Sequence, residues 1–594
     1  MPKRRSAAQA RLMRPLNRRT GLVAGIMLAL ILALAVRLVD LQVVDARTLD
    51  AESNSQISVT QPIYADRGDI DSADGTVLAS TVLRYDVTAA PAEASTFSRA
   101  DGKKSEKVTV EQAMISLAKI TGTPAKTLLS RITANPKSQY ALLASSVDVS
   151  AYDSITALKI PYVYLERHTA RTYPDGAVAG NLVGFTGDSG AQAGLELKEN
   201  SCLAGTDGSE TYERSADGTA LPGTTTVTKK AVSGGTVETT IDADLQYQVQ
   251  QVLDEQVKAL GAQSGTAIVE RVSDGHLLAV ADSPSVDPNN VNGTASGNLY
   301  SKAFTDLYEP GSTMKVLSAA SLIDQGKASP STEVTVPDER TFPWGGRIGD
   351  AETHPVEKLT LTGILANSSN VGISLIGTRL SKQERYDYLE KFGLGQVSGV
   401  DFPGEPTAPL KPVSQWDEQT NYNELFGQGI SATAIQMADA YQAIANGGVR
   451  IPATLVTGCR SADGTVTKTA AQTPVRVVSS STSKQMLEMM ETTMQSGTLS
   501  GTAPISGYSI ATKTGTAQIA DAPNGGYGQD YVTSVAAIAP AADPQYVVFI
   551  TFTKPTVNKT SAGVGPAFRE ITSDVLQDYR VTPNDQESNL PTIW

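Results

Sequence analysis

Ser312 and Lys315 are the residues of this sequence whose types and spacing best fit a chemical reaction. They follow a Pro-Gly turn signal at the start of an apolar helical pattern that stops at Gly326. Ser312 is therefore expected near a helix N-terminus, where backbone N–H groups are unpaired and negative charge is favoured. Because side chains at i and i+3 share one helix face, the Lys315 amine can reach the Ser312 hydroxyl. This is the arrangement of a serine nucleophile with a lysine base.

The spacing of this serine–lysine pair is weak evidence when it is taken alone. Ser116 with Lys119 and Ser481 with Lys484 have the same spacing, and both pairs are interpreted as ordinary polar positions on helices. Other parts of the sequence must therefore decide whether Ser312 is catalytic.

A Ser-x-Asn motif, formed by Ser368 and Asn370, follows a predicted helix over residues 361–366. A serine hydroxyl has a pKa far above 7 and needs a base at about 3 Å before it can act as a nucleophile. Lys315 can serve as that base when it is neutral, and burial beside a second cation such as Lys513 would lower its pKa. Ser368 can relay a proton, and Asn370 can fix the lysines and hold a substrate amide.

A third motif lies in a predicted strand over residues 508–518 and comprises Lys513, Thr514, Gly515 and Thr516. At the edge of a sheet, this strand would suit a peptide substrate that adds itself as a further strand. Gly515 leaves room for close backbone approach, and the two threonine hydroxyls beside a lysine can bind a terminal carboxylate. The backbone N–H groups of Thr516 and Ser312 could together form an oxyanion hole.

Length, composition and charge restrict the class of protein. The chain has 594 residues, of which 40% are hydrophobic and 19% charged, as expected for a globular protein of three to four domains. The net charge is −13, but the first twenty residues carry seven positive charges and no acid, which leaves −20 for the remainder. This distribution argues against general nucleic-acid binding.

An apolar run follows the basic N-terminus. Residues 21–36 have no polar side chain, and the apolar face continues past Arg37 to residue 41. About twenty such residues span a bilayer, and the basic side should stay in the cytoplasm, which places the rest of the chain outside. A cleaved signal peptide with Ala33 and Ala35 at an A-x-A site is the alternative, but the run is long for one. A retained single-pass anchor is preferred.

The cysteines and histidines are few. Cys202 and Cys459 are the only cysteines; two separate buried thiols are expected, with pairing across domains as the alternative. The histidines, His168, His276 and His354, lie far apart without ligand spacing, so no metal site is expected. A Ser-His-Asp enzyme is also disfavoured, because no Gly-x-Ser-x-Gly elbow surrounds a candidate serine.

The best domain boundary is a stretch rich in Ser, Thr, Gly and Pro over residues 215–235. After it, a strand, a helix over residues 243–260 and a hairpin precede Ser312, an order that predicts an α/β domain with an antiparallel sheet. A further helix over residues 433–446 is expected to be amphipathic and to end at a glycine pair.

With its three motifs in this order after a membrane anchor, the chain resembles a class B penicillin-binding protein from the anchor nearly to its last residue. Motifs similar to those of the family's pedestal and active-site domain occur at residues 67–70, 171–174, 194–196, 240–242 and 427–429. Glu309 before the Pro-Gly turn and the C-terminal residues 589–594 are similar to the cell-division type of actinobacteria.

The resemblance implies an α/β (α+β) fold with one N-terminal transmembrane helix, an elongated mixed pedestal domain and a penicilloyl-serine transferase domain whose antiparallel sheet is flanked by helices. The expected parts are a cytoplasmic basic tail (residues 1–20), the transmembrane anchor (21–41), the dimerisation-like pedestal (42–235), the transpeptidase domain (236–580) and a C-terminal tail (581–594).

The resemblance also implies the activity. Ser312 would attack the penultimate D-Ala of a peptidoglycan stem peptide during septal wall synthesis, β-lactams would acylate the same serine, and no cofactor would be needed. Expected partners are a membrane glycosyltransferase and other division proteins. The alternatives are an elongation-type transpeptidase, a β-lactam sensor, a division scaffold without essential catalysis, and a carboxypeptidase or β-lactamase.

Overall fold

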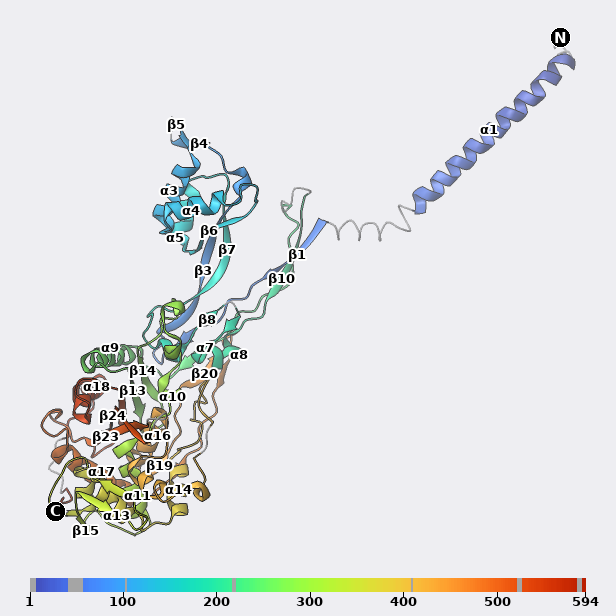
Figure 1. Ribbon diagram of the computed structural model, residues 1–594. Coiled ribbons are helices and arrows are strands. Elements are labelled where there is room, and N and C mark those ends of the chain that lie inside the picture. Colours follow the sequence, from blue (N-terminus) through green and yellow to red (C-terminus); the bar gives the residue numbers. More distant parts are fainter. Residues whose placement is uncertain are drawn as a thin grey trace. The chain divides into compact units, whose positions relative to one another are not determined.

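The computed structural model describes residues 7–40, 57–101, 104–187, 189–215, 221–407, 410–520, 526–584 and 590–594 (Figure 1). The chain divides into two compact units, one made of Met1–Ala65 with Thr206–Val232 and the other of Asp66–Gly205 with Ser233–Trp594. Of the predicted basic tail, Lys3, Arg4 and Arg5 lie outside the described residues, as does Asn589 of the C-terminal segment.

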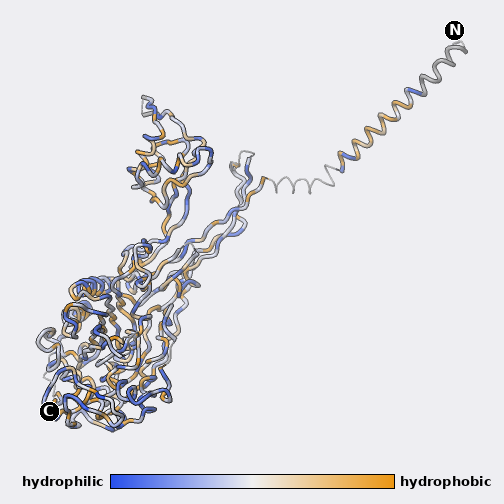
Figure 2. The backbone as a smooth tube through the Cα atoms, viewed as in Figure 1, coloured by the Kyte–Doolittle hydropathy of each residue, from blue (hydrophilic) through white to orange (hydrophobic). Residues whose placement is uncertain are grey.

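The first unit contains the predicted anchor helix. α1 spans Ala7–Val39, and its part from Arg19 to Val39 is long and apolar enough to cross a membrane (Figure 2). The same unit has a three-stranded antiparallel sheet in the order β1 (Ser58–Ile63), β10 (Gly208–Glu213) and β11 (Thr226–Lys229). Residues 21–39 of the anchor predicted from composition therefore lie in one continuous helix.

A five-stranded sheet forms the centre of the second unit. Its order is β14 (Leu277–Ser283), β13 (Ser264–Arg271), β25 (Tyr546–Thr553), β24 (Tyr527–Ala539) and β23 (Ala511–Ala520), and every neighbouring pair is antiparallel. The predicted antiparallel sheet is confirmed. β23, which carries the Lys-Thr-Gly-Thr motif, is an edge strand.

Alternate side chains of this sheet bury against two helical layers, as the two-residue period of a strand requires. Ala267 and Val269 of β13 pack in one core with α9 (Ala243–Leu260) and α18 (Gly565–Asp578). Ile268 packs in the opposite core with α11 (Met314–Asp324) and α16 (Ala434–Ala445). α11, which follows Ser312, is therefore held against the sheet.

The helix predicted over residues 433–446 has the expected bounds but not the expected polarity. Thr433 and Gln436 form a capping box at the start of α16. All twelve residues of the helix are buried, so the prediction of an amphipathic helix is wrong. α16 packs against β25 on one side and α17 (Ser480–Ser496) on another, which leaves it no solvent face.

A mixed sheet joins segments on both sides of the predicted boundary at residue 235. β12 (Thr236–Thr239) pairs in parallel with β2 (Ile70–Asp71) and antiparallel with β20 (Val456–Arg460). The sheet continues through β3 (Val77–Ala89), β6 (Ala141–Val147), β7 (Val163–Thr172) and, beyond β20, β21 (Val466–Lys468). The boundary stays a prediction.

The far ends of β3, β6 and β7 carry a separate small core. It contains residues of α3 (Val110–Thr121), α4 (Ala125–Thr133) and α5 (Val149–Ala157), beside the hairpin of β4 (Phe97–Asp101) and β5 (Lys104–Val108). The shorter elements that connect or cover these parts are α6 (Gly180–Val183), α7 (Gly194–Lys198), α8 (Asn200–Leu203), α10 (Lys302–Thr305), α12 (Leu361–Ala366), α13 (Asn370–Gly377), α14 (Lys382–Lys391), α15 (Thr420–Asn423), β8 (Thr186–Gly187), β9 (Gly190–Ala191), β15 (Glu333–Val336), β16 (Glu339–Thr341), β17 (Arg347–Gly349), β18 (Glu357–Thr360), β19 (Val449–Arg450) and β22 (Val475–Arg476).

A buried ion cluster lies beside β3 and β7. Glu196 of α7 is fully buried and accepts from Arg67 Nε at 2.6 Å and from Arg171 Nε at 2.6 Å. The Tyr173 hydroxyl also donates to this carboxylate, at 3.3 Å. Arg171 donates in addition to the Gly68 carbonyl at 2.7 Å. The cluster explains why the pedestal motifs singled out in the sequence are rich in arginine and carboxylate.

The C-terminal segment packs onto the start of α12. The carbonyl of Thr592 accepts from Thr360 Oγ1 at 2.6 Å, and the carbonyl of Ile593 accepts from Thr360 N at 3.2 Å. Gly363 faces the Ile593 carbonyl so closely that a Cβ there would lie 2.1 Å from its oxygen. The described end of the predicted tail is thus bound to the helix that precedes Ser368.

The two cysteines form a disulfide between Cys202 of α8 and Cys459 of β20. The expectation of two separate buried thiols is therefore wrong. Their separation of 257 residues in the sequence gave no sign of proximity, but the pairing of β20 with β12 brings Cys459 beside Gly235, where Cys202 also lies. The bond crosslinks α8 to β20, a strand that lies in the sequence between the Ser-x-Asn and Lys-Thr-Gly motifs.

Removing this crosslink is expected to destabilise the protein. Replacing Cys202 by serine should lower stability by about 2–4 kcal/mol, because the disulfide restricts the unfolded chain over a long loop. Thermal unfolding with and without reductant measures the effect. Reductant should lower the Tm of the wild type and leave that of Cys202→Ser unchanged; equal Tm values for all samples would contradict a stabilising role.

Candidate active site

Ser312 lies in a 3-10 turn, Gly311–Thr313, that leads directly into α11. Gly311 has φ +58°, and a Cβ on it would lie 2.9 Å from the Ala517 Cβ of β23, so glycine is required at this turn. Thr313 Oγ1 donates to the Pro310 carbonyl at 2.8 Å, and the Tyr441 hydroxyl of α16 donates to the Thr313 carbonyl at 2.8 Å. These contacts fix the position of Ser312 at the helix start that the sequence predicts.

Lys315 is fully buried one turn after Ser312. Its Nζ lies 3.0 Å from Ser312 Oγ and 3.3 Å from Ser368 Oγ, and it also donates to the Ser368 carbonyl. A neutral amine has two hydrogens and one lone pair. The Ser368 carbonyl and hydroxyl can accept the hydrogens, which leaves the lone pair for the Ser312 hydroxyl proton.

Ser368 joins the two lysines. It follows α12 with φ +55°, a left-handed conformation that directs the chain into α13. Its Oγ accepts from Lys513 Nζ at 3.0 Å as well as from Lys315 Nζ at 3.3 Å. The hydroxyl therefore lies between two amines, in a position from which protons can pass.

Asn370 has a different set of contacts from the one expected. Its Nδ2 donates to the Gly349 carbonyl at 3.2 Å, rather than to either lysine. Asn370 is the first residue of α13, and the Ser369 hydroxyl caps the N-terminus of this helix. Asn370 is placed at the site by α13, and its amide oxygen is the part of the side chain left for other contacts.

The edge strand β23 brings the third motif to the same place. Lys513 is almost fully buried, and its Nζ donates to the Thr514 carbonyl at 3.0 Å besides Ser368. A Cβ on Gly515 would lie 2.4 Å from Ser534 Oγ and 3.2 Å from the Pro310 carbonyl, so its absence lets β23 pack on the serine turn. Thr516 is exposed, and its Oγ1 accepts from Ser561 N at 3.2 Å.

Burial changes the acid–base behaviour of both lysines. It lowers the pKa of Lys315 well below its usual value, and the charge of Lys513 lowers it further, whereas Asp350 acts in the opposite direction. Burial also lowers the pKa of Lys513, to about 7. Both shifts favour the neutral amine over the ammonium form, and a base for the serine hydroxyl must be neutral.

Sequence reasoning missed Asp350, which lies directly after β17. Its Oδ2 accepts from Ser369 Oγ at 2.6 Å, and its Oδ1 accepts from Val371 N at 2.9 Å. No motif spacing in the sequence points to this residue, because its role depends on tertiary contacts with the start of α13. His354, considered only as a metal ligand or triad member, contacts the same carboxylate at 3.1 Å.

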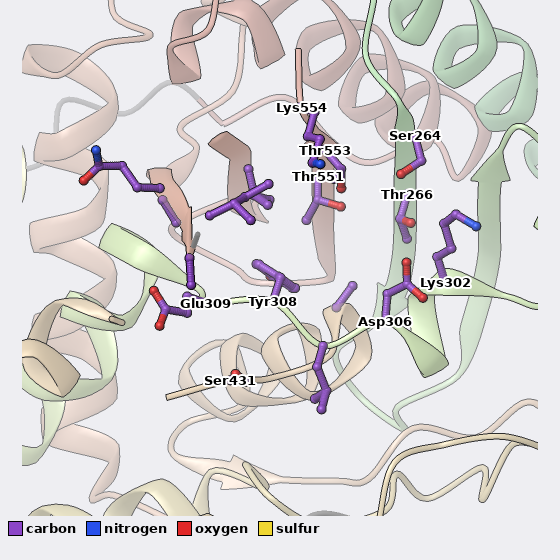
Figure 3. A pocket seen from close by; sticks show the side chains of 17 residues that line it. Ser264, Thr266, Lys302, Asp306, Tyr308, Glu309, Ser431, Thr551, Thr553 and Lys554 are labelled. Carbon is purple, nitrogen blue, oxygen red and sulfur yellow. The ribbon is translucent and has the colours of Figure 1, made fainter. Parts of the chain in front are cut away.

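A cavity of about 370 Å³ lies beside the segment that leads into Ser312 (Figure 3). Tyr308 and Glu309 of that segment line it together with the end of β23, and Ser264 and Thr551 contribute hydroxyls from β13 and β25. Ser312 and the two active-site lysines are not among its seventeen lining residues. The cavity is therefore distinct from the cluster of catalytic motifs.

In the part of the chain that the structure describes, no group of three or more His, Cys, Asp and Glu side chains is placed to hold a metal ion. The chemistry of the cluster can be written with serine, lysine and asparagine side chains alone. Its parts match a serine acyltransferase: a nucleophile, a buried amine with a lowered pKa, a bridging hydroxyl and an edge strand.

Two family models match this chain. The penicillin-binding protein transpeptidase domain matches residues 265–573, and the penicillin-binding protein dimerisation domain matches residues 62–239. Penicillin-binding protein PbpB of Mycolicibacterium smegmatis is 36% identical, covering 95% of this chain and 90% of that protein. Peptidoglycan D,D-transpeptidase FtsI of Escherichia coli is 30% identical, and the match covers 95% of this chain and 92% of that protein.

Solved structures agree with these matches. Penicillin-binding protein 3 of Mycobacterium tuberculosis, complexed with aztreonam, is 29% identical with a TM-score of 0.69, over 90% of this chain and 100% of that one. The chain belongs to the class B penicillin-binding proteins. Within that class it is of the cell-division type, which removes the elongation-type alternative.

Proposed function

We propose that this chain cross-links peptidoglycan stem peptides through an acyl-enzyme formed on Ser312. The observation that carries the proposal is the 3.0 Å contact between Ser312 Oγ and the buried Lys315 Nζ. The lowered pKa of Lys315 makes its amine available as a base.

In the first step, Lys315 accepts the Ser312 hydroxyl proton while Oγ attacks the carbonyl carbon of the penultimate D-Ala. The oxyanion receives hydrogen bonds from the backbone N–H groups of Ser312 and Thr516. The peptide C–N bond then breaks, and the terminal D-Ala leaves with a proton that passes from Lys315 through the Ser368 hydroxyl. The product is an ester between Ser312 and the shortened stem.

In the second step, the amine of a neighbouring stem attacks this ester. The amine loses a proton to the Lys315–Ser368 pair, a new peptide bond forms, and Ser312 regains its hydroxyl hydrogen. The stem lies along the open edge of β23 as an added strand, with its terminal carboxylate at Thr514, Thr516 and Lys513. Asn370 holds a substrate amide.

A β-lactam follows the first step only. Its ring amide takes the place of the D-Ala-D-Ala bond, and opening of the ring leaves a penicilloyl ester on Ser312 that no amine resolves. The relative from Mycobacterium tuberculosis was solved with aztreonam, a β-lactam, and a similar arrangement in this chain would bind drugs of that kind.

The proposal extends to location and partners. The helix from Arg19 to Val39 would anchor the chain in the cell membrane with its N-terminus inside, so that the transpeptidase domain works outside, at the division septum. Glycan strands would come from a membrane glycosyltransferase, and other division proteins would contact the chain beside it.

Labelling with a fluorescent penicillin tests the proposed nucleophile. Wild-type protein should be labelled covalently and stay labelled for many minutes, whereas Ser312→Ala should not be labelled, because it lacks the hydroxyl that lies 3.0 Å from the Lys315 amine at the start of α11. Ser481→Ala is the matched control, since Ser481 precedes Lys484 with the same spacing. Labelling of Ser312→Ala would contradict the proposal, and rapid loss of label from the wild type would favour a β-lactamase.

A further inference from the structure

Asp350 connects the loop after β17 to the Ser-x-Asn motif. Its Oδ2 accepts from Ser369 Oγ at 2.6 Å and its Oδ1 from Val371 N at 2.9 Å, while the adjacent Gly349 carbonyl accepts from Asn370 Nδ2 at 3.2 Å. Three successive residues at the start of α13 are therefore tied to residues 349 and 350. The side chain of Asp350 is only 7% exposed, so water does not compete strongly for these bonds.

His354 contacts the same oxygen of the Asp350 carboxylate as Ser369 does. Its Nε2 lies 3.1 Å from Asp350 Oδ2, and its Nδ1 lies 2.7 Å from the Pro355 carbonyl oxygen. A carbonyl and an ionised carboxylate only accept hydrogen bonds, so both ring nitrogens must carry hydrogen. The contacts therefore select the imidazolium form of His354, a cation next to the carboxylate.

The charge of Asp350 also acts on Lys315 of α11. Its negative charge raises the pKa of Lys315, against the lowering by burial and by Lys513. Asp350, which orders the Ser-x-Asn motif, thus favours the protonated form of Lys315, although the reaction needs its neutral amine. A cation in contact with the carboxylate reduces this effect of Asp350 on Lys315.

We propose that Asp350 and His354 are positioning residues for the reaction at Ser312: Asp350 holds the Ser368–Asn370 segment in place, and the imidazolium of His354 balances the Asp350 charge so that Lys315 can act as the base. This inference rests on the proposed function of Ser312 and Lys315. According to this inference, His354, which lies outside the three motifs, helps to set the pH range of acylation.

The surroundings of His354 are consistent with its charged form. Burial lowers its pKa, but the hydrogen bonds to the Pro355 carbonyl and to Asp350 outweigh burial, and the net shift is upward. The other acid that faces its ring is Glu357 of β18, with Oε2 3.8 Å from Nδ1. At the start of α13, Ser369 and Val371 contact the Asp350 carboxylate through neutral donors.

The pH dependence of penicillin acylation separates this role from a purely structural one. The rate should rise with pH as Lys315 loses its proton. In His354→Gln the Asp350 charge is no longer balanced, so this rise should move to higher pH by about one unit. In Asp350→Asn the opposing charge is gone, so the rise should move to lower pH. His354→Lys, which restores a cation, should return the rise toward its wild-type position.

The controls distinguish failure of this inference from failure of the proposed function. His168→Gln removes an imidazole beside Asp86 in the pedestal sheet, 3.8 Å away, and should leave the profile unchanged. Profiles of His354→Gln and Asp350→Asn that coincide with the wild type, or move in the same direction, would overturn the inference while labelling still depends on Ser312. Labelling that persists in Ser312→Ala would overturn the proposed function itself.

Discussion

Replacing Lys315 by methionine is expected to lower the rate of penicillin acylation about a thousandfold, within the range that a positioned general base contributes. The amine lies 3.0 Å from Ser312 Oγ, and without it the hydroxyl has no group to accept its proton. Methionine has a similar length and avoids the cost of a buried amine, so the Tm should not fall. Stopped-flow or time-resolved labelling at fixed pH measures the rate.

A matched control for this substitution lies on α17. Lys484 follows Ser481 with the same three-residue spacing, but its side chain is exposed. Lys484→Met should therefore acylate at the wild-type rate. If Lys315→Met also kept the wild-type rate, Lys315 would not be the base, and the proton of Ser312 would have to leave by another route.

Replacing Glu196 by alanine is expected to destabilise the protein by about 3–5 kcal/mol, the usual cost of breaking a buried ion cluster by removing one partner. Glu196 accepts from Arg67 and Arg171, each at 2.6 Å, and its side chain is fully buried. Its removal leaves two guanidinium groups without their carboxylate. Thermal and denaturant unfolding should show an earlier transition, and protein that remains folded should still be labelled by penicillin.

An exposed ion pair on the same helix provides the comparison. Lys198 Nζ lies 2.6 Å from Asp401 Oδ2, with the Asp401 side chain 72% exposed. Exposed pairs contribute at most about 1 kcal/mol, so Lys198→Ala should change the Tm little. Equal changes for Glu196→Ala and Lys198→Ala would mean that the buried cluster does not stabilise the pedestal.

Local signals in the sequence predicted most helices and strands. The predicted helix over residues 243–260 coincides with α9, where Asp242 caps the N-terminus and Gly261 ends the helix in a left-handed conformation. The predicted hairpin before Ser312 and the predicted strand of the Lys-Thr-Gly motif are found in the antiparallel sheet, whereas the strand before α9 belongs to the mixed sheet. Caps, turns and two-residue periods are local, so they can be read without knowledge of the tertiary fold.

The contacts that depend on tertiary structure could not be predicted in this way. The disulfide of Cys202 and Cys459 joins residues 257 apart, and the burial of α16 on all sides depends on the elements around it. The parallel pairing of β12 with β2 likewise joins segments on either side of a Gly-rich stretch. Spacing in the sequence contains no information about such approaches.

The sequence predicted the residues of the candidate site but not all of their hydrogen bonds. The order of the three motifs and the resemblance to a known family identified Ser312, Lys315, Ser368 and Lys513, and the structure brings them within hydrogen-bond distance. Asn370 donates to Gly349 rather than to a lysine. Asp350 was missed because its hydrogen bonds to the start of α13 are tertiary contacts and leave no periodic pattern in the sequence.

The central claim is that Ser312 forms the acyl-enzyme, and mapping the acylated residue tests it most directly. Wild-type protein is treated with penicillin, digested, and analysed by tandem mass spectrometry for the added mass of the drug. The account predicts a penicilloyl group on Ser312, in the peptide that also contains Lys315, and none on the peptides of Ser116 or Ser481. A stable adduct on any residue other than Ser312 would contradict it.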